Sequence, residues 1–187
     1  MTQNIQFKFD ETKATQAVAR LIDKSGGKLN YLLAIKMLYT IDRTALTNWS
    51  KPVIGGSYYS LPKGPIISEA YDLMKTGKKA DVSNFWTTHV MTKKFDLHLK
   101  KNPGNSELSE AEAQLVDDVH AMLAHRNKWD VVQWTHDEFQ EWNDPKGGNK
   151  PIQVKDILRA VGKTSKDIQT IKKENSYYHK LNALLGR

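Results

Sequence analysis

The chain contains no cysteine, which excludes disulfide bonds and thiolate metal ligands. Long apolar runs are missing too: the longest spans residues 31–41, where Lys36 and Thr40 interrupt it. A membrane-spanning helix needs roughly 20 apolar residues. The opening residues, MTQNIQFKFDETK, lack the apolar stretch of a secretory signal. We therefore expect a soluble, cytoplasmic protein with no membrane partner.

The usual catalytic signatures are also missing. The sequence has no GxSxG nucleophile elbow, no phosphate-binding loop and no HExxH zinc motif. His120 and His125 are five residues apart, so a helix would splay them away from a shared metal ion. His136 adjoins Asp137 and Glu138, but adjacent residues on a helix do not face one another, so we interpret it as a structural histidine, hydrogen-bonded at a helix start. We predict no enzyme activity, no catalytic residue, no metal and no cofactor.

What the chain does have is an uneven distribution of charge. The net charge is +7, and residues 146–187 alone hold ten Lys or Arg against three acidic residues. Residues 1–145 are neutral overall. Such asymmetry indicates an acidic partner, either a protein or a nucleic acid, although a solvated basic face has the same composition.

Apolar periodicity predicts a mainly α-helical fold. Residues 12–24 and 28–43 are predicted as helices, and the second is apolar almost all round, which is typical of a central core helix. Ser109 and Glu112 form a capping-box pattern at the start of a third helix. Helices are also predicted at 66–75, 108–126, 129–142, 153–161 and 165–185.

Alternating hydrophobicity predicts a small sheet beside these helices. Phe95, Leu97 and Leu99 share one side of a strand-like segment at 84–100, and residues 57–61 form a second candidate strand. We expect a mainly α (α+β) domain with a small antiparallel sheet or hairpin built from around 57–61 and 86–100. The segment NDPKGGNKP at 143–151 is typical of a linker. The sequence thus predicts a domain at 1–145 and a basic helical extension at 146–187, packed on or near it.

Lys36 is the least expected residue of the predicted central helix. A lysine is rarely buried without a partner, and no acid lies one helical turn away: Thr40 occupies that position and Asp42 is six residues on. The ammonium must reach solvent along its stem or meet an acceptor from elsewhere in the fold. The segment around Gly64-Pro65 and the element containing His136 are the candidates for that acceptor.

The C-terminal segment VKDILRAVGKTSKDIQTIKKE has a loose helix-turn-helix pattern. Two predicted helices flank Gly162, Ser165 is placed to cap the second, and Lys166, Lys172 and Lys173 would meet phosphates. Any two short basic helices around a glycine match this pattern. A nucleic-acid-binding regulator therefore stays open as an alternative function.

Four motifs occur in order along the chain: KMLYTID at 36–42, GGSYYSLPKGPIISEAY at 55–71, LSEAE at 108–112, and Thr135-His136 followed by Trp142. Over roughly residues 15–145 this set resembles the Panacea-domain, SocA-like antitoxin family. The residue types at the matching positions suggest structural roles rather than catalysis. The landmark positions are Lys36, Tyr39, Asp42, Gly64, Pro65, His136 and Trp142.

The resemblance implies a prokaryotic or phage antitoxin of a toxin–antitoxin system. It would neutralise its cognate protein toxin by direct protein–protein interaction, without a cofactor; some relatives instead deliver a toxin to a protease. The basic extension has the composition of an anchor patch, because two tyrosines lie among lysines. The expected partner-binding residues are Lys172, Lys173, Tyr177, Tyr178 and Lys180.

Overall fold

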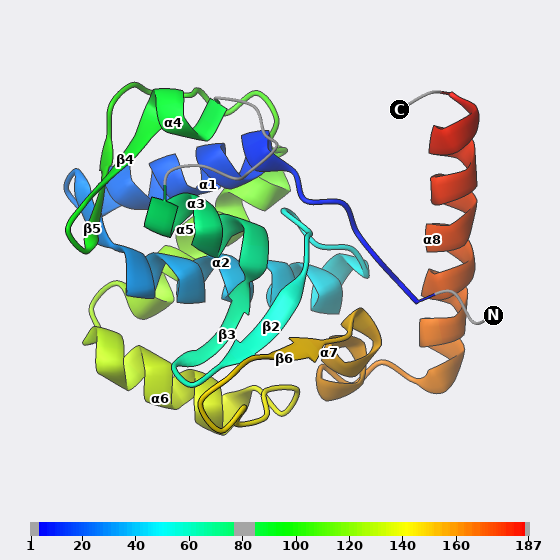
Figure 1. Cartoon of the computed structure of the whole chain (residues 1–187). Coiled ribbons are helices and arrows are strands. Elements are labelled where there is room, and N and C mark those ends of the chain that lie inside the picture. Colours follow the sequence, from blue (N-terminus) through cyan, green and yellow to red (C-terminus); the bar gives the residue numbers. More distant parts are fainter. Residues whose placement is uncertain (1–3, 77–84, 186–187) are drawn as a thin grey trace.

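The computed structural model describes residues 4–76 and 85–185, and in these residues it has eight helices and two antiparallel sheets of three strands (Figure 1). The helices are α1 (Glu11–Lys24), α2 (Tyr31–Trp49), α3 (Ser68–Thr76), α4 (Phe85–His89), α5 (Glu110–Leu123), α6 (Lys128–Glu138), α7 (Val154–Ala160) and α8 (Ser165–Leu184). The strands are β1 (Lys28–Asn30), β2 (Tyr58–Leu61), β3 (Gly64–Ile67), β4 (Val90–Lys93), β5 (Asp96–Leu99) and β6 (Lys150–Ile152). The prediction of a mainly α fold with a small antiparallel sheet is confirmed. No helix of the described residues has both the length and the apolar character needed to cross a membrane.

Helix α2 is the centre of the core, as its apolar sequence predicted, but its predicted bounds of 28–43 are wrong. The helix begins only at Tyr31, because the side chain of Asn30 accepts a hydrogen bond from the amide of Leu32 and caps it. Residues 28–30 form β1 instead, where Leu29 pairs with Leu97 of β5. The helix then runs on to Trp49 and ends where Ser50 adopts a left-handed conformation, with φ of 60°.

The predicted pairing of residues 57–61 with 86–100 is wrong, because the two segments belong to different sheets. Strand β2 pairs with β3 and β6, whereas β4 and β5 form a hairpin that pairs with β1. Residues 85–89 are helical, and Lys94, with φ of 58°, reverses the chain between β4 and β5. Phe95 is therefore 64% exposed at the turn rather than on the inner face with Leu97. Apolar and polar residues alternate in both strands of a hairpin, so this pattern alone does not show where the turn lies.

The end of the predicted linker contributes to the fold. Residues 150–152 form β6, in which Ile152 pairs with Tyr58 and Lys150 with Ser60 of β2. Helix α7 follows, with Ile157 buried in the main core cluster. Strand β6 and α7 thus share the core of the preceding elements, and the predicted domain boundary at residue 145 stays a prediction.

Helix α8 stands beside the body of the molecule, and the N-terminal segment reaches across to it (Figure 1). The side chain of Asn175 accepts a hydrogen bond from the amide of Gln6 at 3.2 Å and donates one to the carbonyl of Gln6 at 2.8 Å. Ile171 is buried nearby, with 6% of its surface exposed. The helix is capped by Thr164, which forms a capping box with Asp167, and not by Ser165 as predicted.

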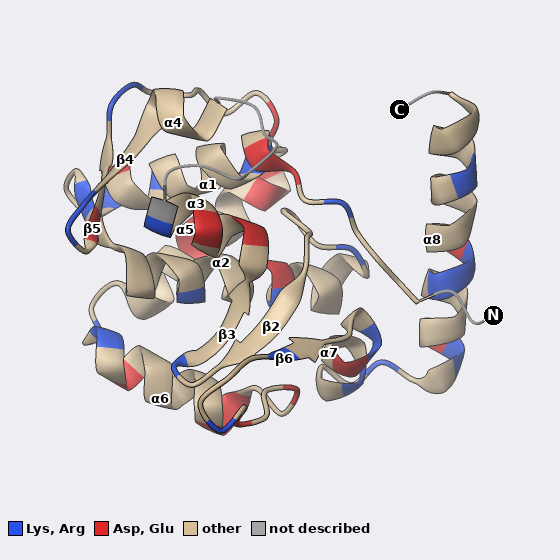
Figure 2. Ribbon diagram, viewed as in Figure 1, with Lys and Arg blue, Asp and Glu red and all other residues tan. Residues whose placement is uncertain are grey.

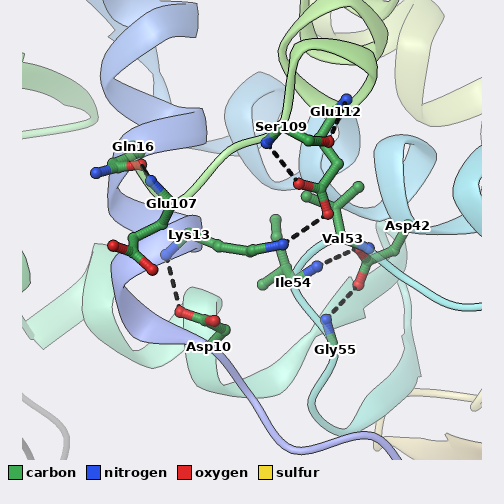
Figure 3. Close-up of polar contacts among 10 residues, drawn as sticks. All are labelled: Asp10, Lys13, Gln16, Asp42, Val53, Ile54, Gly55, Glu107, Ser109 and Glu112. Carbon is green, nitrogen blue, oxygen red and sulfur yellow. Dashed lines mark hydrogen bonds and ion pairs between the residues drawn. The ribbon is translucent and has the colours of Figure 1, made fainter. Parts of the chain in front are cut away.

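The capping box predicted at the start of α5 is present (Figure 3). Ser109 accepts from the amide of Glu112, and the Glu112 carboxylate accepts from the amide of Ser109. The same carboxylate accepts from Lys13 Nζ of α1 at 2.6 Å. Both this ammonium and the hydrogen bonds hold the pKa of Glu112 below its usual range, although burial opposes them. One cap therefore also joins α1 to α5.

Candidate functional site

Asp42 of α2 is fully buried, and its carboxylate accepts four hydrogen bonds (Figure 3 shows three of the donor residues). Oδ1 accepts from the amides of Val53 and Ile54 at 2.9 and 2.8 Å, and Oδ2 accepts from the amide of Gly55 and the hydroxyl of Tyr58, both at 2.9 Å. Burial raises the pKa of this carboxyl to about 7, although each hydrogen bond lowers it. The aspartate thus fastens the loop after α2 onto the middle of that helix.

Lys36, six residues before Asp42, is also buried, with 1% of its surface exposed. Its Nζ donates to the carbonyl oxygen of Pro65 at 2.7 Å, which confirms the prediction that its acceptor comes from the Gly64-Pro65 segment. Burial lowers the pKa of the ammonium to about 7. A side chain at Gly64 has no room here: its Cβ would lie 2.5 Å from Thr135 Oγ1 and 3.0 Å from Lys36 Nζ.

His136 and Trp142 form the third part of this region. Their rings stack with centroids 3.8 Å apart and an interplanar angle of 10°, and Trp142 Nε1 donates to the carbonyl oxygen of Leu61. His136 lies in the last turn of α6, and its buried Nε2 has no hydrogen-bond partner among the described residues. The prediction of a histidine hydrogen-bonded at a helix start is therefore wrong: ring stacking positions it. Burial, and then the charge of Lys36, lower its pKa.

Tyr39 contacts a partly buried ion pair between Arg43 and Glu141 that was not predicted from the sequence. Its hydroxyl donates to Glu141 Oε1 at 3.0 Å, and Arg43 Nε donates to the same oxygen at 2.8 Å. The guanidinium also lies 4.4 Å from the ring centre of Phe139. Helical spacing was the available signal, because Arg43 lies one turn beyond Tyr39 and two beyond Lys36 on one face of α2. Nothing in the local sequence marked Glu141 as its partner.

The landmark residues therefore meet at one place, the junction of α2, the β2–β3 hairpin and α6. Tyr39 packs edge-on against Tyr58, the residue whose hydroxyl also binds Asp42. Lys36 binds the hairpin at Pro65, and Trp142 binds it at Leu61. These side chains point inward and hold the elements to one another. We call this set the α2–hairpin junction; it contains Lys36, Tyr39, Asp42, Gly64, Pro65, His136 and Trp142.

The residues predicted to bind a partner lie elsewhere, on α8. Lys173 and Lys180 are exposed, and Lys172 is half-buried. Tyr177 and Tyr178 are 65% and 61% exposed, with ring centres 6.2 Å apart. Figure 2 shows Lys and Arg along α8 and in the turn that precedes it. The structure thus separates the two predicted groups, because the landmarks build the interior and the basic and aromatic residues face solvent.

A groove of about 690 Å³ lies beside α8. One wall comes from the body, where Trp49 ends α2 and Pro52 lies in the segment that follows, and Phe7 of the N-terminal segment lines it as well. The other wall is α8 itself, which contributes Tyr178 and Asn182. Groups of three or more His, Asp or Glu side chains that could hold a metal ion do not occur among the described residues.

The fold and this junction define the class of protein. It is a mainly α-helical domain whose sequence motifs form a buried polar network rather than the lining of an open cleft. Residues 35–143 match the family model for the SocA-like antitoxin, Panacea domain. The chain belongs to this family. No curated protein and no solved structure matches the chain.

Proposed function

We propose that this protein is an antitoxin that neutralises a partner toxin by direct protein–protein binding. The observation that carries the proposal is the match of the antitoxin domain to residues 35–143. The arrangement of the landmarks supports it, because Lys36, Tyr39 and Asp42 are buried and bound to other parts of the chain. A surface that is free of the family motifs can differ from one antitoxin to the next and so suit different toxins.

Growth rescue tests this proposal directly. We expect the reading frame next to this one to encode a protein that stops growth when expressed alone, and we expect co-expression of this chain to restore growth. The measurement is colony formation with both genes under separate promoters, with a frameshifted copy of this chain as the control. Growth arrest that this chain does not relieve would contradict the proposal. Rescue that disappears in a protease-deficient host would instead identify an adaptor that delivers the toxin for degradation.

We also propose that the protein is not an enzyme, and His136 provides the test. Its Nε2 is buried and one face of its ring is covered by Trp142, so the imidazole is poorly placed to exchange protons with a substrate. We expect His136→Gln to keep full growth rescue while losing about 0.5–1.5 kcal/mol of stability with the ring stack. Thermal unfolding and growth rescue measure the two effects. A folded variant without rescue would show that the imidazole has a chemical role.

Nucleic-acid binding is the second candidate function, because the helix-turn-helix pattern has a structural counterpart. Helices α7 and α8 are joined by a turn in which Gly162 has φ of 85°, and Lys166 and Lys173 are exposed on α8. Phosphate contacts make binding steeply dependent on salt concentration. Absence of any mobility shift of duplex DNA at low salt would remove this candidate.

A further inference from the structure

Helix α8 continues its apolar face beyond the part of the molecule that covers it. Ile171 and Asn175 lie on that face, and they are only 6% and 9% exposed. Tyr178 and Leu185 follow Ile171 by seven and fourteen residues, close to two and four helical turns, and therefore extend the same face. They are 61% and 59% exposed. Among the described residues, this face is therefore covered at Ile171 and Asn175 and exposed at Tyr178 and Leu185. We call the exposed stretch at 178–185 the bare face of α8.

In the half of α8 that follows Asn175, His179 Nε2 lies within hydrogen-bond distance, 2.9 Å, of the carbonyl oxygen of Gln6, whereas the large apolar side chains of this half stay exposed. Isolated helices are marginal in water, and most helical stability in proteins comes from packing of an apolar face. Leu184 is 84% exposed at the end of the helix, and Tyr177 is 65% exposed. Neighbouring exposed apolar side chains of this size are typical of interaction sites rather than of a solvated helix.

The groove lies between the bare face of α8 and a second surface, on the body of the molecule. Tyr178 and Asn182 face it from α8, and Trp49 and Pro52 face it from the body. Trp49 and Pro52 lie inside the stretch that matches the antitoxin family, whereas α8 lies beyond it. A ligand in the groove would therefore contact the family domain and the C-terminal helix together.

We propose that this groove and the bare face of α8 form the docking site for an acidic segment of the partner toxin that carries apolar side chains. The inference rests on the proposed antitoxin function and assigns its binding surface. Charge favours an acidic occupant: residues 146–187 hold ten basic residues against three acidic ones, and the groove is lined by Lys8, Lys13 and Lys51 against Asp10 and Glu174. Acidic groups on the partner would be attracted by this positive charge.

Other occupants fit these observations less well. A second copy of this chain would bring the same net charge of +7, and so the two basic extensions would repel each other. The phosphates of a nucleic acid would pair with the lysines and its bases would stack on the tyrosines, but its phosphate backbone has no apolar group to cover Leu184 and Leu185. A protein segment with both acidic and apolar side chains satisfies both groups.

The test compares two variants against the toxin that growth rescue identifies. In the first variant, Tyr178→Ser and Leu185→Ser are combined; in the matched control, Phe95→Ser removes an aromatic of similar exposure, 64%, from the β4–β5 turn. Because the changed side chains are exposed, we expect both variants to fold, which circular dichroism and thermal unfolding check. We expect the double variant to bind the toxin at least tenfold more weakly and the control to bind within about twofold of the wild type.

A charge reversal examines the acidic character of the occupant. Lys51→Glu should weaken toxin binding and flatten its salt dependence, whereas Lys101→Glu, an exposed lysine outside the groove, should change neither. Removal of the whole extension is unsuitable for this purpose, because it would also remove β6 and the buried Ile157 and Leu158.

The outcomes separate this inference from the proposed function. Unchanged affinity and full rescue by the double variant would overturn the docking site while the antitoxin role stands. Failure of the wild-type chain to rescue growth would overturn both. Duplex DNA binding at low salt that the double variant loses would assign the face to nucleic acid and overturn the toxin as its occupant.

Discussion

Replacement of Asp42 by asparagine is expected to lower the free energy of unfolding by about 3–5 kcal/mol. The reason is geometric. Each carboxylate oxygen of Asp42 accepts two hydrogen bonds, and all four partners are donors. An asparagine keeps one acceptor oxygen and turns an NH₂ group toward donors, so two of the four lose their acceptor inside the protein. A buried donor without an acceptor costs about 1–3 kcal/mol.

Urea unfolding at pH 8 measures this effect, because the pH then lies above the pKa of about 7 that burial gives Asp42. The matched control is Asp118→Asn, which makes the same chemical change at an exposed position of α5. We expect the control to shift the free energy of unfolding by no more than about 0.5 kcal/mol. Equal effects of the two substitutions would show that the four hydrogen bonds at Asp42 do not hold the loop.

Asp42, one of the landmark residues, has a structural role. The loop at 53–55 closes onto α2 through that carboxylate, and Gly55 within it has φ of 73°, with the carbonyl oxygen of Lys8 2.6 Å from where a Cβ would stand. Only glycine fits such a position without strain. This part of the motif therefore serves the folding of the domain.

Local patterns in the sequence predicted the helices well and the pairing of strands poorly. Capping signals such as Ser109 with Glu112 act within one turn, so they can be read without knowledge of the fold. Strand β6 pairs with β2 across about ninety residues of chain, and Lys150-Pro151-Ile152 is too short and too rich in turn formers to stand out. These residues form a strand because they pair with the edge of β2, a contact that the local sequence does not show.

The α2–hairpin junction was predicted in part for the same reason. Lys36 conflicted with its apolar neighbours, and that conflict indicated a distant acceptor, which the structure supplies at Pro65. Glu141 is as deeply buried, yet an acidic residue in a polar segment creates no conflict, so nothing drew attention to it. On α8, the sequence reading grouped Tyr177 with Tyr178, whereas the helix turns adjacent residues by 100° and only Tyr178 lines the groove.

Lys36 is expected to make the stability of the folded protein rise with pH. Its pKa falls from 10.5 in the unfolded chain to about 7 in the folded one, because burial disfavours the ammonium. Between these two values the unfolded state binds a proton that the folded state does not, so the free energy of unfolding increases with pH. The lysine should contribute a slope approaching about 1.4 kcal/mol per pH unit from pH 7 toward pH 10.

Lys36→Met removes the titrating group and keeps an unbranched side chain of similar size. The difference in free energy of unfolding between wild type and variant should grow as pH rises from 7 to 10, because other groups titrate alike in both proteins. Near pH 7 the variant still loses the hydrogen bond that Pro65 accepts, worth about 1–3 kcal/mol, and regains part of the cost of burying the amine. Lys101→Met, at an exposed lysine, is the matched control and should give a flat difference. A flat difference for Lys36→Met would mean that the ammonium keeps its charge in the folded protein, held by an acceptor set stronger than the single carbonyl oxygen of Pro65.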